Sequence, residues 1–312
     1  MRRILIAAAT LLLSVQIHAQ NLTVLHMNDT HSHIDPQRSG EYIGRGGAIE
    51  QAALIDSVRT ADGKRNVLLL HAGDFGQGTS YFTEMNGDIE IDVLNSLGFD
   101  VVCLGNHEFD NGIAELSRRL AKLKAQVVCA NYDFSSTPLA GLVKPYVVIS
   151  KGNRKIGVVG LLTDLSSVVS PQISALLKYQ DPSEVAEKYG RQLKDDGCDL
   201  VIALTHTGYP VDCEVAANTR SIDVVVGGHT HTVLDEMTIV KNLDGKDVKV
   251  VTNGKWGVSI ARMAIDFQQN RLTALYDSEY LPTAYLAYER TGERQIMEAP
   301  FKGKYVFKIT EL

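Results

Sequence analysis

Polar residues of the kinds that bind metal ions recur in this sequence directly after short apolar runs. NDTH (28–31) follows LTVLHM, GD (73–74) follows VLLLHA, and GNHEFD (105–110) follows VVCL. Further along the chain, THTG (205–208) follows LVIAL and GGHTH (227–231) follows IDVVV. Because ligands bind at the carboxyl ends of the strands in α/β sheets, we expect the five clusters to meet at one crevice.

The donor atoms in these clusters are oxygen and imidazole nitrogen, without sulfur, which suits borderline or hard divalent ions. Seven such ligands are too many for one tetrahedral ion and match two ions that share a carboxylate. Two dications with only two aspartates leave a net positive site, which favours a phosphate. Paired metals also lower the pKa of a bound water towards about 7. The candidate ligands are Asp29, His31, Asp74, Asn106, His206, His229 and His231.

Each motif also has an ordinary structural explanation when it is taken alone. A DxH or GD sequence after a strand is more often a turn or a cap, and His206 can simply hydrogen-bond in a loop. GGHTH can be a glycine-rich turn with two solvated imidazoles. Five such motifs, each just beyond a predicted strand, favour a joint site over five separate turns.

The elements that position these clusters alternate between strands and helices. Amphipathic segments with apolar spacing near 3.6 lie at 48–59, 113–123 and 183–196. This alternation predicts a largely parallel sheet, and the strand-like runs after Gly228 predict a more antiparallel second half, so a two-sheet sandwich flanked by helices fits both. The predicted strands are 22–26, 67–71, 101–104, 127–129, 147–149, 155–161, 200–204, 222–226, 238–240, 248–252 and 258–267.

The composition is that of an ordinary globular protein. The chain has 312 residues, 45% of them hydrophobic, which provides core for one large α/β domain or two small ones. The formal charge of -6 gives no global basic field, and no long run of Lys or Arg is present. We therefore expect no polymeric nucleic acid as a partner.

Residues 1–19 have the features of a secretory signal peptide. Arg2 and Arg3 precede an apolar run at 4–13, and Ala19 ends a segment suited to cleavage. The apolar run is too short to span a bilayer. We predict removal of residues 1–19, export to the periplasm, and no membrane attachment after cleavage.

The four cysteines are an even number in a chain predicted to leave the cytosol, so a disulfide is an option. Cys103 and Cys129, however, lie in apolar strand-like runs, where a free thiol behaves as a small hydrophobe. We favour buried thiols over a bridge for this pair and make no prediction for Cys198 and Cys213. The absence of a CxxC pair excludes a thiolate zinc site.

The ordered set DxH, GD, GNHE, THTG and GGHTH resembles the calcineurin-like dinuclear metallophosphatases. More narrowly, NDTH, RGG (45–47), GNHEFD and GGHTH resemble the catalytic domain of secreted bacterial 5'-nucleotidases and UDP-sugar hydrolases. The match runs from about residue 22 to 267. The resemblance implies a four-layer α-β-β-α sandwich of two mixed sheets flanked by helices, with a catalytic domain at 20–280.

Carried over by position, the resemblance implies ligand sets for two divalent ions, Zn or Mn in the first place, although the donors also admit Fe, Co or Mg. One ion is assigned to Asp29, His31, Asp74 and His231. The other is assigned to Asp74, Asn106, His206 and His229, with Asp74 bridging. Because the family's nucleotidases can have Gln at the position of His231, the histidine here can alter the metal preference.

His107 and Asp110 match the family's catalytic His-Asp pair. In that pair the imidazole binds the phosphate and assists the leaving group, while the carboxylate orients the ring. The alternative for Asp110 is a helix N-cap ahead of NGIAELSRRL.

Other polar residues near the motifs are assigned smaller roles. His33 matches no ligand position, so we expect it at the surface or behind a ligand. His26 and His71 lie within predicted strands and are expected in the core or beside the ligands. Arg45 either faces the site or begins a helix, and Asn131 contacts substrate or forms a turn.

These features predict an exported phosphoesterase that hydrolyses a nucleotide or related small phosphoester by attack of a metal-bound hydroxide. Full-length members of the resembled family add a nucleotide-binding C-terminal domain, which we expect to be absent here, with residues 281–312 forming a tail. Three explanations are then open: a separate polypeptide supplies that domain, the tail replaces it, or the enzyme does not recognise the nucleobase. Alternatives for the function are a thiosulfate-ester hydrolase, and a non-catalytic or split-enzyme subunit that docks a separate nucleotide-binding partner.

Overall fold

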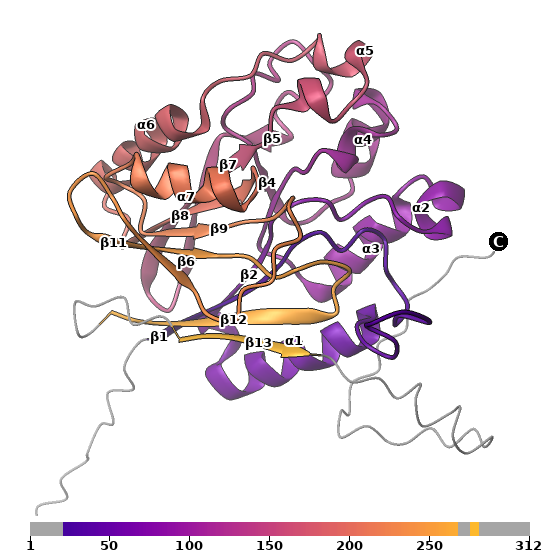
Figure 1. The fold of residues 1–312 in the computed structure, drawn as a ribbon, viewed down its shortest axis with the longest axis horizontal. Helices are drawn as coiled ribbons and strands as arrows, with labels where there is room; N and C mark the ends of the chain where they lie inside the picture. Colours follow the sequence, from indigo (N-terminus) through magenta and orange to yellow (C-terminus); the bar gives the residue numbers. More distant parts are fainter. Residues whose placement is uncertain (1–20, 268–274, 281–312) are drawn as a thin grey trace, which may run out of the picture.

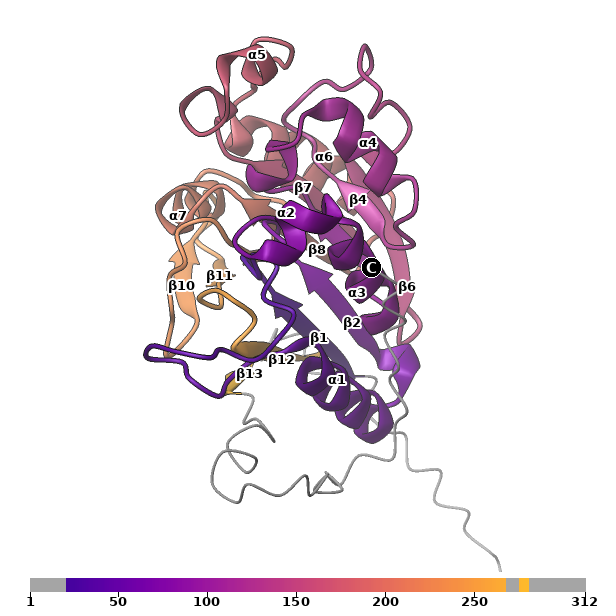
Figure 2. The ribbon, with the colours of Figure 1, turned by 90° about the vertical axis from the view of Figure 1, so that its right-hand side faces the viewer.

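The computed structural model describes residues 21–267 and 275–280 (Figure 1). The predicted signal peptide at 1–19 and the predicted tail at 281–312 lie outside the described residues. Two β-sheets form the centre of the described part, and helices lie on both outer sides (Figures 1 and 2). Among the described residues, no helix is long and apolar enough to span a bilayer.

The first sheet contains the strands that precede three of the polar clusters. Its strands β1 to β5 run parallel in the order of the sequence, and helices lie in the connections from β1 to β2, from β2 to β3 and from β3 to β4. Strand β12 pairs antiparallel with β1, and β13 pairs antiparallel with β12. In spatial order the strands are β13 (Leu275–Tyr280), β12 (Ser259–Asp266), β1 (Asn21–Met27), β2 (Val67–His71), β3 (Val101–Cys103), β4 (Gln126–Val128) and β5 (Val143–Lys144).

The second sheet carries the two histidine-rich clusters. Its central strands β7, β8, β9 and β11 are parallel, and the edge strands β6 and β10 are antiparallel to their neighbours. In spatial order the strands are β10 (Thr238–Lys241), β11 (Asp247–Val251), β9 (Val224–Val226), β8 (Leu200–His206), β7 (Arg154–Leu162) and β6 (Tyr146–Lys151). Both sheets are mixed, as predicted.

Helices cover the outer face of each sheet. Helices α1 (Ala48–Asp62), α3 (Asp88–Leu97) and α4 (Ile113–Leu120) pack against the first sheet. Helices α6 (Pro182–Asp195) and α7 (Tyr209–Ala217) pack against the second (Figure 1). Two short helices, α2 (Ser80–Met85) and α5 (Pro171–Ser174), and 3₁₀ turns η1 (Lys64–Asn66), η2 (His107–Phe109) and η3 (Leu165–Ser167) lie in the connections.

Alternation of side chains along the strands gives each sheet two apolar faces. In β8, Ile202 points into the core between the sheets, whereas the neighbouring Val201 points to the helices. The sheets approach closely, since a Cβ added to Gly160 of β7 would lie 2.3 Å from the carbonyl carbon of Val128 in β4. The four-layer α-β-β-α sandwich predicted from the sequence is confirmed.

All four cysteines are free thiols. Cys103 and Cys129 are buried, as predicted, and are not bridged to each other, and Cys198 and Cys213 are also free.

The predicted helices at 48–59, 113–123 and 183–196 correspond to α1, α4 and α6, whereas α3 and α7 were not predicted from the sequence pattern.

Candidate metal centre

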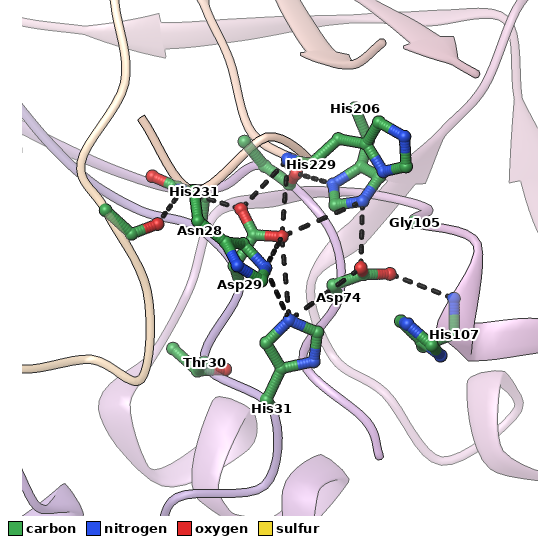
Figure 3. A network of polar contacts seen from close by, with 12 residues as sticks. Asn28, Asp29, Thr30, His31, Asp74, Gly105, His107, His206, His229 and His231 are labelled. Atoms are coloured by element: carbon green, nitrogen blue, oxygen red, sulfur yellow. Dashed lines mark hydrogen bonds and ion pairs between the residues drawn. The ribbon is translucent and has the colours of Figure 1, made fainter. Parts of the chain in front are cut away.

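The polar clusters lie at the carboxyl ends of five central strands, three from the first sheet and two from the second. Loops after β1, β2 and β3 carry Asp29, Asp74 and Asn106. His206 is the last residue of β8, and the loop after β9 carries the two histidines of GGHTH. Figure 3 shows the imidazole rings of His31, His206, His229 and His231 around the carboxylates of Asp29 and Asp74. The structure therefore brings loops that are distant in the sequence to one crevice.

Three overlapping groups of side chains within the described residues could each hold an ion, with one donor atom per residue within 4.8 Å of the others. His31 Nε2 lies 2.9 Å from His231 Nε2 and 3.7 Å from Asp29 Oδ1, and it is 4.0 Å from Asp74 Oδ2. His231 Nε2 is 3.3 Å from Asp29 Oδ1. The groups are Asp29, His31 and His231; Asp74, His206 and His229; and His31, Asp74 and His107.

These groups consist of carboxylates and imidazoles, and the remaining predicted ligand, Asn106, offers an amide oxygen instead. It lies between Gly105 and His107, and the backbone nitrogen of His107 donates to Asp74 Oδ1 at 2.9 Å. Its own amide oxygen, Oδ1, is buried and has no hydrogen-bond partner. A buried amide oxygen without a donor is costly, so this atom is suited to a cation.

Five of the seven predicted ligands adopt the left-handed backbone conformation, which is uncommon for residues other than glycine. Such strain persists only where surrounding contacts enforce it, and it concentrates at functional sites. Asp29 illustrates the enforcement, because its backbone N donates to Gly73 O at 3.0 Å and its O accepts from Trp256 N at 2.7 Å. The residues and their φ angles are Asp29 (51°), His31 (47°), Asp74 (54°), His229 (80°) and His231 (53°).

Asp74 and His206 form the closest carboxylate–imidazole pair among the predicted ligands, with Oδ2 and Nε2 3.0 Å apart. Burial lowers the pKa of His206, but Asp74 and Asp29 outweigh it and raise this pKa to about 10. For Asp74, burial favours the neutral acid, yet the charge of His206 reverses the shift and holds the pKa well below its ordinary value. The pocket therefore favours ionised carboxylates and an added positive charge.

Hydrogen bonds fix the orientation of these ligands. His206 Nδ1 lies 2.7 Å from the carbonyl oxygen of Ala72, which can only accept, so Nδ1 carries the hydrogen and Nε2 faces the carboxylates. Asp29 Oδ2 accepts from Asn28 Nδ2 at 2.7 Å and from the backbone N of His229 at 2.9 Å. Partners of this kind set the tautomer and the direction of a metal ligand.

His107 and Asp110 form a pair at the open side of the crevice. Their Nδ1 and Oδ2 atoms are 2.9 Å apart, and about a third of each side chain is exposed, 32% and 31%. The hydrogen bond to Asp110 raises the pKa of His107, in opposition to partial burial. Asp110 does not cap helix α4, whose N-cap is Gly112 without a side-chain bond, so the N-cap alternative is wrong.

The residues that were assigned smaller roles lie around the crevice. His33 stacks on Trp256 with ring centroids 5.1 Å apart, and its Nδ1 lies 2.8 Å from His31 O. His26 and His71 are fully buried, and His71 Nε2 lies 3.1 Å from Thr30 Oγ1. Asn131 is buried and both ends of its amide bond the backbone of Leu162, so it has a structural role and does not face substrate.

Two buried carboxylates beside the ligands were missed in the sequence. Glu108 accepts hydrogen bonds from the backbone amides of Asp74, Gly76 and Gly105. Asp212 accepts from Thr205 Oγ1 and Thr207 Oγ1, both at 2.6 Å, on either side of His206. The only local signal for Glu108 is its place inside GNHEFD, and Asp212 has no signal in its own helix.

The chain is similar to known proteins over most of its length. Residues 22–233 match the family model of the calcineurin-like phosphoesterases. A snake venom 5'-nucleotidase of Naja atra is 37% identical over 222 residues, which make up 68% of this chain and 41% of the relative. A probable 5'-nucleotidase of Treponema pallidum is 35% identical over 225 residues, or 70% of this chain and 38% of that relative.

A solved structure is similar over most of the chain. The 5'-nucleotidase precursor from Thermus thermophilus superposes with a TM-score of 0.75 at 33% identity, covering 86% of this chain and 57% of the other. The chain thus spans less than two thirds of each of these relatives. The family match extends over the strands and loops that carry all seven predicted ligands, and the chain belongs to the calcineurin-like phosphoesterase family.

Proposed function

We propose that this chain is a phosphoesterase of the 5'-nucleotidase type that works with two divalent metal ions. The observation that supports it most is the convergence of carboxylate, imidazole and amide donors from the carboxyl ends of five strands beside the His107–Asp110 pair. A structural metal site needs only the ligands. The pair adds a proton donor at the open side, which favours hydrolysis over the alternative of a non-catalytic docking subunit.

The donors fit two ions. Asp29, His31 and His231 would hold the first and share Asp74 with the second, which Asn106, His206 and His229 would complete. The buried, unpartnered Oδ1 of Asn106 supports this assignment, because an amide oxygen can bind a cation without a charge of its own. Nitrogen and oxygen donors without sulfur suit Zn or Mn.

When bound, the two ions supply positive charge that activates a water and neutralises the phosphate. Side chains of the protein position the ligand loops and transfer the proton to the leaving group. Ionised Asp29 and Asp74 accept hydrogen bonds from the backbone N of His229 and of His107, and so hold the loops that carry the other ligands. The oxygen of the activated water would form the new bond to phosphorus, in line with the bond to the leaving oxygen that breaks.

His107 is the residue that we assign to the leaving group. The carboxylate of Asp110 accepts from Nδ1, so Nε2 carries the proton that can be transferred. As the bond between phosphorus and the leaving oxygen breaks, Nε2 protonates that oxygen, and phosphate and an alcohol are formed. The raised pKa of His107 supports its protonated form before the reaction.

The substrate that we propose is a nucleotide or a related small phosphoester. The Naja atra, Treponema pallidum and Thermus thermophilus proteins are all named as 5'-nucleotidases, which supports this class over other phosphoesters. We also propose a catalytic domain at 20–280 and export to the periplasm after removal of residues 1–19, on the basis of the Arg2-Arg3 start and the apolar run that follows.

Phosphate release by the metal-stripped protein, reloaded with Mn or Zn, tests the proposal. The substrates are AMP, UDP-glucose, a 2',3'-cyclic nucleotide and an aryl phosphate. We expect metal-dependent turnover that is lost in Asp74→Ala and His107→Ala and kept in Asp244→Ala, a matched change at an exposed turn. Two bound ions without release from any substrate would contradict the proposal and favour the docking subunit.

A further inference from the structure

The carboxylate of Glu108 connects the two loops that carry Asp74 and Asn106. Glu108 has no exposed surface. Its Oε2 accepts from the backbone N of Asp74 at 2.9 Å and of Gly105 at 2.6 Å, and its Oε1 accepts from Gly76 N at 3.0 Å. One side chain thus takes three amide donors, two from the loop after β2 and one from the loop after β3.

These hydrogen bonds fix the distance between the loop after β2 and the loop after β3, which carry the candidate ligands Asp74 and Asn106. Asp74 has a φ of 54°, a conformation that requires support from its surroundings. Its Oδ1 accepts from His107 N at 2.9 Å, and a Cβ added to Gly105 would lie 2.2 Å from the same oxygen. The loops therefore touch, and Glu108 is the group that satisfies the amides at this contact.

Arg119 of helix α4 supports Glu108 from behind. It is fully buried, and its Nη2 donates to the backbone O of Glu108 at 2.7 Å. Gly87 leaves space for the Arg119 guanidinium, because a Cβ added to Gly87 would lie 2.5 Å from Nη1. A buried guanidinium is retained only where opposite charge compensates it, and Glu108 and Glu90 are the carboxylates that act on it most strongly.

We propose that Glu108 is a positioning residue that sets the separation of Asp74 and Asn106 and thereby forms the second divalent-cation site. The inference rests on the proposed function, because Asp74 and Asn106 are ligands only in that account. The first site takes a single loop from this pair, the loop of Asp74. The second takes both loops, so loosening the link affects the second site more.

Glu108→Gln is the sharpest test because it preserves size and removes one acceptor. The glutamine amide has one oxygen, so its NH₂ group must face an N–H donor, either that of Gly76 or those of Asp74 and Gly105. Removal of partners behind metal ligands typically weakens metal binding about 10- to 100-fold. The matched control is Glu115→Gln in α4, a partly exposed glutamate that pairs with Arg118.

The measurement is calorimetric titration of metal-free protein with MnCl₂, together with the EPR signal of a coupled Mn(II) pair. We expect two binding events in the wild type and in Glu115→Gln. In Glu108→Gln the second event weakens about 10- to 100-fold, the first changes by less than about threefold, and the coupled signal is lost at Mn concentrations that saturate the wild type. Unchanged events in Glu108→Gln would overturn the inference.

Two further outcomes separate positioning from general stability. Equal weakening of both events, in step with a lower melting temperature of the metal-free variant, means a merely structural role and overturns the inference. Hydrogen exchange of the metal-free wild type tests the same hydrogen bonds without a variant. The backbone amides of Asp74, Gly76 and Gly105, which donate to Glu108, must be protected, and rapid exchange of all three would overturn the inference. A wild type that binds fewer than two ions refutes the proposed function instead, which distinguishes the two failures.

Discussion

Gly105→Ala adds one methyl group at the contact between two loops of the candidate metal centre. The new Cβ would lie 2.2 Å from Asp74 Oδ1 and 2.4 Å from Asp74 N. Carbon and oxygen atoms in proteins do not approach below 3.0 Å in this way, so the loops must separate by roughly 1 Å. The neighbour is backbone and a buried carboxylate, neither of which can rotate away freely.

A displacement of this size is large for a metal site. Ligand distances have to hold within about 0.2 Å, and a misplacement of about 1 Å in an active site can cost about 100-fold in rate. We expect Gly105→Ala to lower metal-dependent phosphate release at least about 100-fold, while the circular dichroism spectrum of the metal-free protein stays that of the wild type.

Gly157→Ala is the matched control for an added buried methyl group. Its Cβ would lie 2.7 Å from Leu193 Cδ1, where β7 packs against α6. Gly157 pairs with Val201 in the sheet, five residues before the candidate ligand His206 along β8. The assay compares phosphate release and Mn binding in the two variants and the wild type. A Gly105→Ala protein that binds two ions with wild-type affinity and keeps more than half its activity would refute the reasoning.

Three further predictions follow from the same structure. His107→Ala should lower kcat about 100- to 10,000-fold, and Asp110→Asn should lower it less. For both variants the loss should be larger on AMP than on p-nitrophenyl phosphate, because a good leaving group needs little protonation. Equal losses on both substrates would argue against a leaving-group role. Burial lowers the pKa of His26 and His71 to about 3, below the ordinary 6.5, so the unfolded chain takes up the protons first and stability falls as pH decreases from about 6.5. Each histidine then costs about 2 kcal/mol at pH 5, and urea unfolding of the metal-free protein at pH 7 and pH 5 should show a difference that is about 2 kcal/mol smaller in His26→Leu; an equal difference in both proteins would contradict this pKa. Ellman's reagent should modify Cys213, the least buried cysteine, before the others, and rapid labelling of Cys103 or Cys129 in the native protein would contradict their burial.

The positions of the clusters could be predicted from the sequence because each is a local pattern. A short apolar run rich in β-branched residues, such as VVCL, favours a buried strand, and a polar group directly after it then lies at the carboxyl end of that strand. The parallel arrangement then brings Asp29, Asp74 and Asn106 to one edge. The ligand roles of these residues stay predictions until metal binding is measured.

Other parts of the structure could not be predicted because they depend on tertiary contacts. Helix α3 begins DIEIDV, which alternates apolar and polar residues as a strand does, and its helical form is settled by packing against α1 and the first sheet. Asp110 has a residue type that suits an N-cap, so its own position left that role open. The family resemblance indicated His107 as its partner, and the structure shows the hydrogen bond between them. Glu108 gains its importance from amides in another loop, which a sequence pattern cannot indicate.

The central claim is that the seven predicted ligands hold two ions, and anomalous diffraction from crystals grown with Mn or Zn tests it most directly. The account predicts two anomalous peaks roughly 3.5 to 4 Å apart, bridged by Asp74, with His31 and His231 on one ion and His206 and His229 on the other. A single peak, or a pair of peaks bound by other residues, would contradict it.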